Sequence, residues 1–526
     1  MPVTPTYPGI YIEELPSSAR TITAAPTSIA VFVGYTHPFK TKPENFNKAI
    51  QIFNFTEYER EFGGFYSSGI FDTNMAYAVN NFFLNGGSVA YIVGLKAENY
   101  YRSNNNPPVP ITAPTTLIGA DPIGIVFTAL EPTDDQITMQ VSVTPDSTGN
   151  TADILITYNS RVENYRGVSL DSSSENYIDK RLGTVSKPIS SLVTVAPASG
   201  GYGGSFTSAT QKLTSSLPSN FETTFSSTDF TKVFSQDSSL DKVSIFNLLI
   251  IPGIADTTIW STALAFCERK QAFLILDPPK QAVPDGTSDP NLLMALLMTK
   301  ADSPIPKSTN GAIYFPYLRS TNPLTGQPLD LPPSGYVAGI YAKTDLNRGV
   351  WKAPAGLETI ISNTIGVVEE GRMTDQRQGT LNPIGVNCIR SFPGVGTVVY
   401  GSRTLVGSDT NTAYQQWKYV PVRRIALFIE QTLIRNLGWV VFEPNDEPLW
   451  AAIRGSIEGF MLSLFNQGAF QGSTPSLAFQ VKCDKSTTTV QDVNNGIVNI
   501  VVAFAPLKPA EFVIIKIAQL AGQVQS

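Results

Sequence analysis

The residues that could carry out chemistry are few and lie far apart along the chain. His37 is the only histidine among the 526 residues. A Ser-His-Asp triad would therefore have to use His37, and one histidine cannot supply a histidine-rich metal site. Because His37 stands next to Pro38, we expect it to be an ordinary residue of a surface loop.

The cysteines and a glycine-rich stretch offer no further site. Cys267, Cys388 and Cys483 are widely spaced and form no CxxC motif, so disulfides are not expected and a reducing cytosol is the default compartment. The sequence GGYGG at 200–204 lacks the GK[ST] of a phosphate-binding loop. A hinge or a turn is therefore the better interpretation of that stretch.

One carboxylate stands where α/β enzymes place their sites. Asp277 follows the apolar run 273–276, at the carboxyl end of a predicted strand. No basic partner or nucleophile lies near it in the sequence, and we expect no catalytic role. No paired-carboxylate frame, metal-ligand spacing or nucleophile elbow is recognisable elsewhere. The sequence thus predicts a protein that is not an enzyme and uses no cofactor or metal.

The composition favours a protein that is part of an assembly. Hydrophobic residues make up 42% of the chain, which is enough for real cores. Charged residues make up only 15%, against about 25% in a typical soluble protein. A lightly charged chain often hides surface against partners. The formal net charge of −6 gives no indication of a nucleic-acid partner.

Nothing in the sequence predicts direct insertion into a membrane. The first residues show neither the basic nor the apolar region of a signal peptide. The longest apolar runs, such as 497–505 and 512–517, are far shorter than the roughly 20 residues that a membrane-spanning helix needs.

Alternating strands and helices predict an α/β body. Apolar runs rich in valine and isoleucine indicate buried strands, and apolar residues at helical spacing mark the helices between them. Strand–helix–strand order favours a sheet with helices packed against it. The predicted strands are 28–35, 89–94, 243–253, 273–276 and 311–318, and the predicted helices are 72–84, 256–270 and 291–298.

Residues 331–356 are the stretch around which this body is organised. Pro332 and Pro333 suit the first turn of a helix, where a missing N–H costs nothing. Gly339 lowers helix propensity, which indicates close packing against another backbone. We expect a tight interior helix and then a turn that begins at Asp345.

Residues 101–240 differ from the rest of the chain in composition. Serine, threonine, asparagine, proline and glycine dominate, and only short alternating stretches survive, such as 137–143 and 154–158. We interpret this segment as an inserted β-rich domain with long loops.

The C-terminal region predicts a compact α+β domain. Amphipathic helices are expected at 423–437 and 446–466. Arg454 and Glu458 lie on the polar face of the second helix, at a spacing that favours a weak ion pair. The remaining β stretches are the turn-rich segment 382–403 and the strands 439–442, 477–483 and 497–505.

An extended strand near each terminus is predicted as a link between subunits. A lone strand is not stable and must pair with a sheet. That sheet belongs either to the strand's own domain or, by strand addition, to another subunit. Two such links per chain would build rings or helices. The predicted linking residues are Tyr7, Gly9, Ile10, Tyr11, Ile12 and Glu13 at one end and Phe512, Val513, Ile514, Ile515 and Ile517 at the other.

Four long stretches are the most distinctive parts of the sequence. They are YPGIYIEELPSSARTITAAPTSIAVFVG at 7–34, FFLNGGSVAYIVG at 82–94, PPSGYVAGIYAKTDLNRGVWKAPAG at 332–356 and RRIALFIEQTLIRNLGWVVFEPNDEPLW at 423–450. In these stretches and in their order, the chain resembles the contractile tail sheath proteins of phages, tailocins and extracellular injection systems. The resemblance covers roughly residues 1–100 and 240–526, whereas 101–240 match poorly.

The resemblance implies a fold and a division into domains. The body would be an α/β domain of the subtilisin-like sheath type, carrying an inserted β-rich outer domain and a C-terminal α+β domain. The implied division is an arm at 1–20, the body at 21–100 and 241–380, the insert at 101–240, the C-terminal core domain at 381–505 and a second arm at 506–526.

The resemblance also implies a function. Sheath subunits stack as six-fold rings around an inner tube, and a baseplate trigger lets them rearrange to a shorter, wider helix that drives the tube through a target envelope. The implied partners are further copies of the chain, the inner tube protein, and baseplate and tail-terminator proteins. Arg454 and Glu458 would contact the tube. Assembly would occur in the bacterial cytoplasm, in a particle released on lysis or anchored in the cell.

Two other functions stay open. The chain could form a non-contracting shell or adhesin of a tail-like particle, with residues 101–240 as the binder. It could instead be a degenerate subtilisin-like hydrolase, although a single histidine argues against that.

Overall fold

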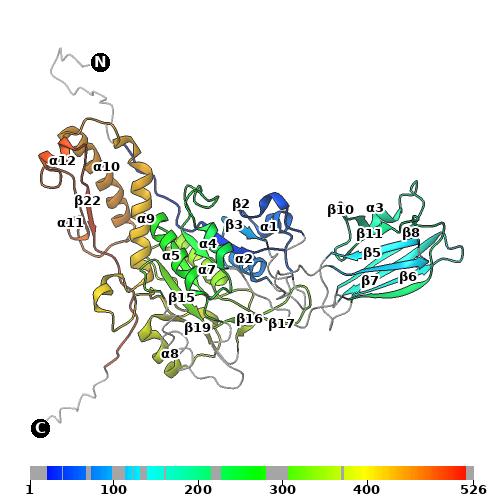
Figure 1. Cartoon of the computed structure of the whole chain (residues 1–526). Helices are drawn as coiled ribbons and strands as arrows, with labels where there is room; N and C mark the ends of the chain where they lie inside the picture. Colours follow the sequence, from blue (N-terminus) through cyan, green and yellow to red (C-terminus); the bar gives the residue numbers. More distant parts are fainter. Residues whose placement is uncertain are drawn as a thin grey trace, which may run out of the picture.

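An eight-stranded sheet runs through the body of the protein (Figure 1). Its strands are β1 (Ala30–Tyr35), β2 (Ala49–Ile52), β3 (Ala90–Leu95), β13 (Leu248–Ile250), β14 (Phe273–Leu276), β15 (Gly311–Phe315), β19 (Val386–Phe392) and β20 (Gly396–Val399). In the order β2-β3-β1-β13-β14-β15-β19-β20, the strands from β3 to β19 run parallel and the two edge strands are antiparallel to their neighbours. The computed structural model describes residues 20–37, 40–66, 73–96, 113–120, 122–130, 139–158, 161–214, 227–279, 306–368 and 372–516.

Helices cover both faces of this sheet. Successive residues of a strand point to opposite faces, so Val31 packs in one core and Phe32 in the other. The first core includes α5 (Thr257–Lys270), and the second includes α2 (Asn74–Leu84) and α7 (Ser334–Arg348). Burial on both faces explains why the parallel strands are continuous apolar runs. The predicted α/β order of this body is thereby confirmed.

The predicted interior helix is α7, and it lies tightly against α2. A Cβ atom on Gly339 would come within 2.6 Å of Asn85 Cβ and 2.7 Å of the Phe82 carbonyl oxygen. Gly335 comes equally close to Ala78. The expectation of close backbone packing is confirmed. The expected turn at Asp345 is wrong, because the helix continues to Arg348 and ends at Gly349, whose φ is +84°.

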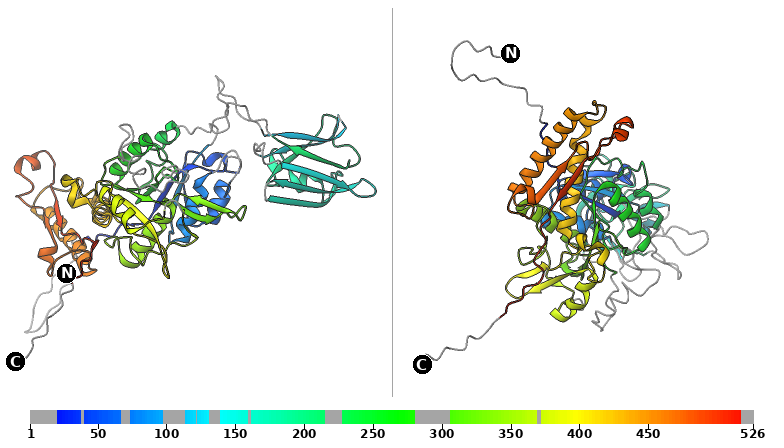
Figure 2. Two further views of the ribbon diagram at one scale, coloured as in Figure 1. Left: turned by 90° about the horizontal axis from the view of Figure 1, so that it is seen from below. Right: turned by 90° about the vertical axis from the view of Figure 1, so that its left-hand side faces the viewer.

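The insert forms a β-sandwich that stands apart from the body (Figures 1 and 2). Its two antiparallel sheets, β11-β5-β4 and β12-β6-β7-β8, share one hydrophobic core. The two predicted alternating stretches correspond to β6 and β7. The strands are β4 (Thr115–Ala120), β5 (Ile123–Ala129), β6 (Met139–Pro145), β7 (Thr151–Tyr158), β8 (Arg161–Ser169), β11 (Val193–Pro197) and β12 (Ala209–Leu213).

The C-terminal region places two long helices side by side (Figure 1). These are α9 (Val420–Asn436) and α10 (Glu447–Asn466), close to the predicted spans. Both pack in one core with the two-stranded sheet of β21 (Phe479–Lys482) and β22 (Val501–Phe504). The same core includes Val350 and Trp351, which follow α7, so it continues into the body.

Several predicted elements differ from the structure. The expected strand at 439–442 is wrong: a 3-10 turn η7 (Gly438–Val440) stands there, none of the described strands pairs with it, and Phe442 is fully exposed. The expected strand at 311–318 is two strands, because Pro316 cannot donate to a ladder. The helix expected at 291–298 lies outside the described residues. The division into domains stays a prediction.

The remaining described elements are short. They are α1 (Phe55–Phe62), α3 (Ile178–Leu182), α4 (Ser227–Val233), α8 (Asp375–Leu381), α11 (Pro475–Ala478), α12 (Val490–Asn494), η1 (Pro43–Asn45), η5 (Asn382–Ile384), η6 (Thr412–Trp417), β9 (Gly183–Thr184), β10 (Lys187–Pro188), β16 (Leu318–Thr321), β17 (Pro328–Leu331) and β18 (Gly366–Val367). Within the described ranges, no helix has the length and apolar character needed to cross a membrane.

Candidate assembly interface

The carboxylate of Glu511 is fastened to the body by three side chains. Arg403 donates from Nε to Oε1 at 2.7 Å and from Nη2 to Oε2 at 2.9 Å. Asn382 Nδ2 donates to Oε1 at 2.8 Å, and the Tyr419 hydroxyl donates to Oε2 at 3.0 Å. We call Arg403, Asn382 and Tyr419 the C-terminal anchor. A two-pronged guanidinium–carboxylate pair of this kind fixes orientation as well as position.

Burial and charge make this contact strong. The Arg403 side chain is fully buried, and the Glu511 side chain is 18% exposed. Burial acts to raise the pKa of Glu511, but the hydrogen bonds from Arg403 and Asn382 outweigh it and hold the pKa below its usual range. Glu511 is therefore ionised at neutral pH and balances a guanidinium that has no access to water.

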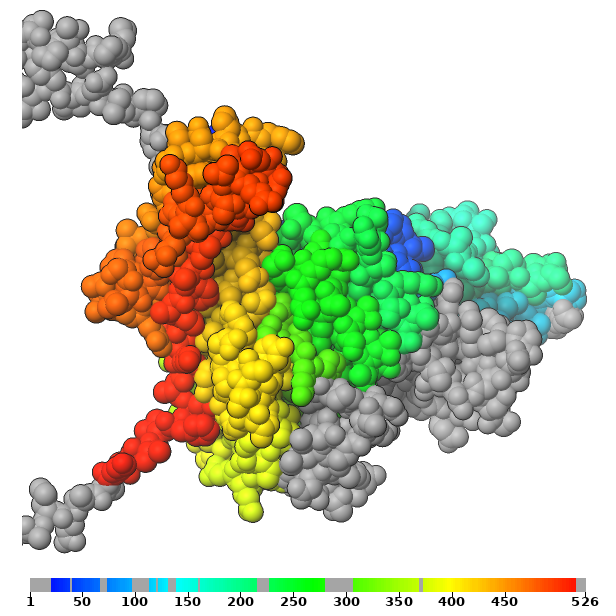
Figure 3. Space-filling view, turned by 60° about the vertical axis from the view of Figure 1, so that its left-hand side comes forward, coloured from blue at the N-terminus to red at the C-terminus, as the bar shows by residue number. Residues whose placement is uncertain are grey.

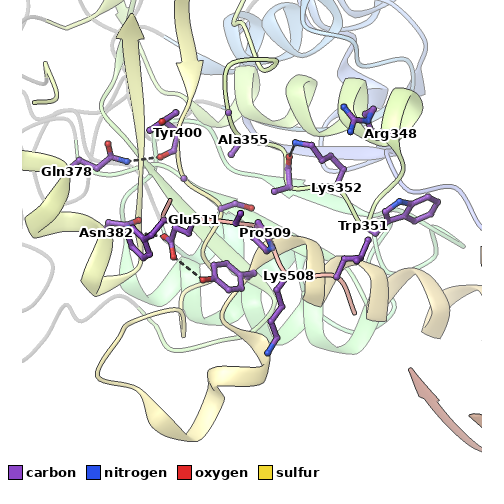
Figure 4. A pocket seen from close by; sticks show the side chains of 18 of the residues that line it. Arg348, Trp351, Lys352, Ala355, Gln378, Asn382, Tyr400, Lys508, Pro509 and Glu511 are labelled. Carbon is purple, nitrogen blue, oxygen red and sulfur yellow. Dashed lines mark hydrogen bonds between the residues drawn. The ribbon is translucent and has the colours of Figure 1, made fainter. Parts of the chain in front are cut away.

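The chain around Glu511 is otherwise loosely attached. Among the described residues 507–516, Glu511 alone forms hydrogen bonds or ion pairs with the rest of the described chain. Residues 507–512 help to line a groove of about 1000 Å³, together with Trp351, Lys352 and Tyr400 (Figure 4). In the space-filling view this C-terminal segment is a narrow band on the surface of the molecule (Figure 3). The anchor thus holds this segment at one point.

Beyond the anchor the chain exposes consecutive apolar residues. The side chains from Phe512 to Ile515 are 70%, 81%, 82% and 78% exposed, and no described residue pairs with them as a strand. A contiguous apolar surface of this kind marks an interaction site. These four predicted linking residues are therefore available to a partner. Ile517 and the predicted residues Tyr7 to Glu13 lie outside the described residues.

The chain that follows the predicted N-terminal arm lies along α9. The side-chain amide of Asn436 bonds to both backbone groups of Thr23, accepting from N–H at 3.0 Å and donating to the carbonyl at 2.8 Å. Thr432 Oγ1 accepts from the Ala25 N–H at 3.1 Å. Arg20 lies 4.6 Å from the ring centre of Trp439. We call Thr432, Asn436 and Trp439 the N-terminal anchor.

The sheet of β21 and β22 has two edges without a partner strand in the described chain. Its four residue pairs run from Phe479 with Phe504 to Lys482 with Val501. One face, including Val481 and Phe504, packs on the helices, whereas the other, including Lys482 and Val501, faces solvent. Unpaired edges present rows of free N–H and C=O groups that can bind an added strand.

The residues predicted to contact the inner tube are arranged differently from expectation. The predicted pair of Arg454 with Glu458 is wrong. Arg454 Nη2 instead lies 2.9 Å from the carboxylate of Glu447, and its Nη1 donates to the Cys483 carbonyl. These partners draw the guanidinium toward the end of β21. Glu458 is exposed on α10, and its tube contact stays a prediction.

His37, the residue that a catalytic triad would need, lies in the packed interior. His37 is buried at 3% exposure, which corrects the expected surface loop, because its ring packs on Tyr66 and its Nδ1 accepts from the Lys40 N–H at 3.2 Å. Burial lowers the pKa of His37 to about 3, with Lys40 adding to the effect. The imidazole is therefore neutral at physiological pH. No group of three or more possible metal ligands occurs within the part of the chain that the structure describes.

Asp277 caps the interior helix. Its carboxylate accepts hydrogen bonds from the Ser334 N–H at 2.8 Å, the Ser334 hydroxyl at 2.6 Å and the Gly253 N–H at 2.9 Å. Burial raises its pKa to about 6, although these bonds oppose the shift. The carboxylate thereby satisfies the Ser334 N–H at the start of α7 and joins the helix to the turn at Gly253. The arrangement explains why an acidic residue is buried at the end of β14.

Sequence reasoning missed both anchors. Arg403 and Glu511 are 108 residues apart, and nothing in their local sequence pairs them. The one available signal was that Arg403 and Glu511 are charged residues inside stretches that are otherwise apolar or small. A buried charge of that kind requires a partner.

Two family profiles match the chain. The phage tail sheath protein central domain matches residues 239–405, and the phage tail sheath C-terminal domain matches residues 412–519. Together the two profiles match more than half of the 526 residues.

Curated relatives are similar over parts of the chain. A putative prophage major tail sheath protein of Pseudomonas aeruginosa (strain UCBPP-PA14) is 25% identical over 280 residues, which are 52% of this chain and 65% of that protein. The tail sheath protein of Vibrio phage KVP40 is 25% identical over 185 residues, which are 35% of this chain and 26% of that protein. The chain thus spans less than two thirds of the length of both relatives.

Solved structures share the fold over nearly the whole chain. A chain of the six-fold symmetrised anti-feeding prophage baseplate has a TM-score of 0.57 at 24% identity and covers 98% of this chain and 99% of its own. The sheath complex of the PVC extracellular contractile injection system, in the contracted state, has a TM-score of 0.58 at 22% identity and covers 98% of both chains. The contracted helical sheath of the anti-feeding prophage has a TM-score of 0.56 at 23% identity, with 98% and 100% covered. At these identities the likeness shows the fold.

Proposed function

Because this chain belongs to the phage tail sheath protein family, we propose that it is the contractile subunit that stacks in six-fold rings around an inner tube. A trigger from the baseplate would let the rings rearrange to a shorter, wider helix that drives the tube through a target envelope. The chain is a sheath protein of phage tail-like particles and contractile injection systems. Its family and structural neighbours are structural proteins rather than enzymes.

The proposal includes specific partners. They are further copies of the chain, the inner tube protein, and baseplate and tail-terminator proteins. The similarity to chains of helical sheath and baseplate assemblies supports self-association and contact with a baseplate. Assembly would take place in the bacterial cytoplasm, and the body would be of the subtilisin-like type. The exposed Glu458 and its neighbour Arg454 would face the tube.

The single observation that carries the proposal is the exposed apolar run from Phe512 to Ile515. Four consecutive apolar side chains that are 70–82% exposed need cover in the working protein. An extended segment of this kind gains both backbone hydrogen bonds and apolar contacts by joining a sheet edge. The C-terminal run would therefore add as a strand to another subunit.

The edges of β21 and β22 are the acceptor that this proposal assigns. A two-stranded sheet is marginally stable alone, and added strands would stabilise it. Each subunit has two edges in this sheet and two predicted arms, so the numbers of donors and acceptors match. Head-to-tail links of this kind build rings or helices rather than closed dimers.

Electron microscopy of native particles tests contraction directly. A contractile sheath predicts two populations, one extended and one contracted, that differ in length and diameter. A single length under all conditions would favour the non-contracting shell instead. A serine-reactive activity probe tests the hydrolase alternative, because only that alternative predicts labelling that depends on His37.

A further inference from the structure

The two anchors lie at the two ends of one helix. Tyr419, which belongs to the C-terminal anchor, is the residue that precedes α9. Asn436, which belongs to the N-terminal anchor, is the last residue of α9. At about 1.5 Å per residue, the 17 residues of α9 separate the anchors by roughly 25 Å.

The start of α9 is tied to residues 402–404, which include Arg403 of the C-terminal anchor. Arg403, which binds Glu511, forms an isolated β-bridge with Tyr419. The Val420 N–H donates to the Ser402 carbonyl at 3.0 Å, and the Thr404 N–H donates to the Lys418 carbonyl at 2.9 Å. The C-terminal anchor and the start of the helix are therefore one hydrogen-bonded unit.

The chain from Thr27 back to Arg20 runs along α9 toward its other end. Arg424, in the first turns, donates to the Thr27 carbonyl at 2.9 Å. Thr432 then holds Ala25, and Asn436 holds Thr23. Figure 1 shows this segment, in dark blue, beside the helix. Contacts repeat over the whole length of α9, so the segment cannot slide along the helix.

Buried polar contacts fix α9 itself to the body. Arg424 pairs with Asp345 of α7, and the two side chains are 3% and 2% exposed. Gln431 accepts from Asn247 Nδ2 at 2.7 Å and donates to the Phe246 carbonyl at 2.9 Å. These contacts fasten α9 to α7 and to the residues that lead into β13.

We propose that α9 is the rigid spacer that sets the distance and direction between the two links that each subunit makes with its neighbours. The inference rests on the proposed function, because it requires that the arms are links. The link toward one neighbour begins directly after Glu511, and the link toward the other begins directly before Arg20. The directions of the two links relative to each other are thereby set before the subunits meet. Because the starting points of both links are fixed before the subunits associate, each contact between subunits costs less conformational entropy.

Two insertions of the same composition test where the C-terminal link begins. Gly-Ser-Gly placed between Glu511 and Phe512 adds slack to the link itself. The same tripeptide placed between Lys508 and Pro509 adds slack on the body side of the anchor. Neither insertion removes a buried charge or an apolar side chain, so both variants should fold.

The measurement is the number of helically ordered sheaths per mass of the full-length protein, counted by electron microscopy. The insertion after Glu511 should lower that number about tenfold, because a longer, flexible link lowers the effective concentration of the arm at its acceptor and leaves its direction undefined. The insertion after Lys508 should give a number within about twofold of that of the wild type. Equal numbers for the two insertions, with or without a loss, would overturn the assignment of α9 and Glu511.

A third variant separates this inference from the proposed function. Removing residues 512–526 deletes the C-terminal link. If that deletion assembles like the wild type, the arm is not a link and the proposed function fails. If the deletion blocks assembly while the two insertions behave alike, the arm is a link. In that case the C-terminal anchor beside the start of α9 does not fix where the link begins.

Discussion

The guanidinium group of Arg424 donates to both carboxylate oxygens of Asp345, at 2.7 Å and 2.6 Å, and both side chains are buried. The same guanidinium lies 4.8 Å from the ring centre of Tyr341. Arg424 belongs to α9 and Asp345 to α7, so this pair joins the C-terminal helices to the central helix of the body.

Replacing Arg424 by methionine should destabilise the fold by about 3–5 kcal/mol, because Asp345 would stay buried without its partner. The measurement is the free energy of unfolding in denaturant. Arg348→Met is the matched control, since the Arg348–Glu358 pair is 52% and 65% exposed and should contribute at most about 1 kcal/mol. Equal losses in the two variants would contradict a special role for the buried pair.

Gly339→Leu should abolish folding, because even a Cβ at this position would lie 2.6 Å from Asn85 Cβ. Gly455→Ala in α10 is the control, since no atom comes within 4 Å of its added Cβ. That control should gain up to about 1 kcal/mol from helix propensity. The measurements are soluble yield and thermal unfolding. A Gly339→Leu protein that assembled but failed to contract would instead make α7 part of the switch.

Glu511→Ala should cost about 1.5–3 kcal/mol, because the buried guanidinium of Arg403 loses its principal charged partner. Asp409, 3.0 Å from Arg403 Nη1, keeps the loss below that of a wholly unpaired charge. Chemical denaturation measures the difference. Glu458→Ala removes an exposed carboxylate of α10 and should leave the unfolding free energy within about 0.5 kcal/mol. A Glu511→Ala protein as stable as this control would show that the anchor contributes nothing.

The raised pKa of Asp277 predicts that its contribution to the free energy of unfolding falls as the pH rises. An ordinary paired carboxylate, whose pKa is lowered, contributes more as the pH rises. The folded pKa of Asp277 is about 6 and its reference value 3.8, so between these values the folded state binds more protons than the unfolded state. The contribution of this group to stability is therefore full below about pH 4 and is lost as the pH rises to about 6, a change of roughly 2–3 kcal/mol.

Asp277→Asn isolates this contribution, because the amide does not titrate. The destabilisation that the substitution causes should be largest near pH 4 and should shrink as the pH approaches 6. Unfolding free energies of both proteins across that range provide the test. A difference that grows with pH would show that the folded pKa is lowered, not raised.

Local sequence signals were sufficient for the parallel strands of the body and for the interior helix, and insufficient for the anchors. The parallel strands are buried on both faces and appear as continuous apolar runs, and Gly339 signals its close approach in the sequence itself. The Arg403–Glu511 and Arg424–Asp345 pairs join residues 108 and 79 positions apart, which no local pattern connects. The run from Trp439 to Phe442 has the composition of a strand, yet the fold provides no ladder beside it. His37 has the sequence context of a loop but is buried against Tyr66, which lies 29 residues further along the chain.

Deletion of residues 1–18 tests the central claim, that terminal strands link the subunits of a contractile sheath. If residues 1–18 pair with a neighbouring subunit rather than with their own fold, the shortened chain should still fold, with an unchanged thermal unfolding midpoint. Under the electron microscope it should appear as monomers or rings, without sheaths. Normal particles that assemble and contract without these residues would contradict the account.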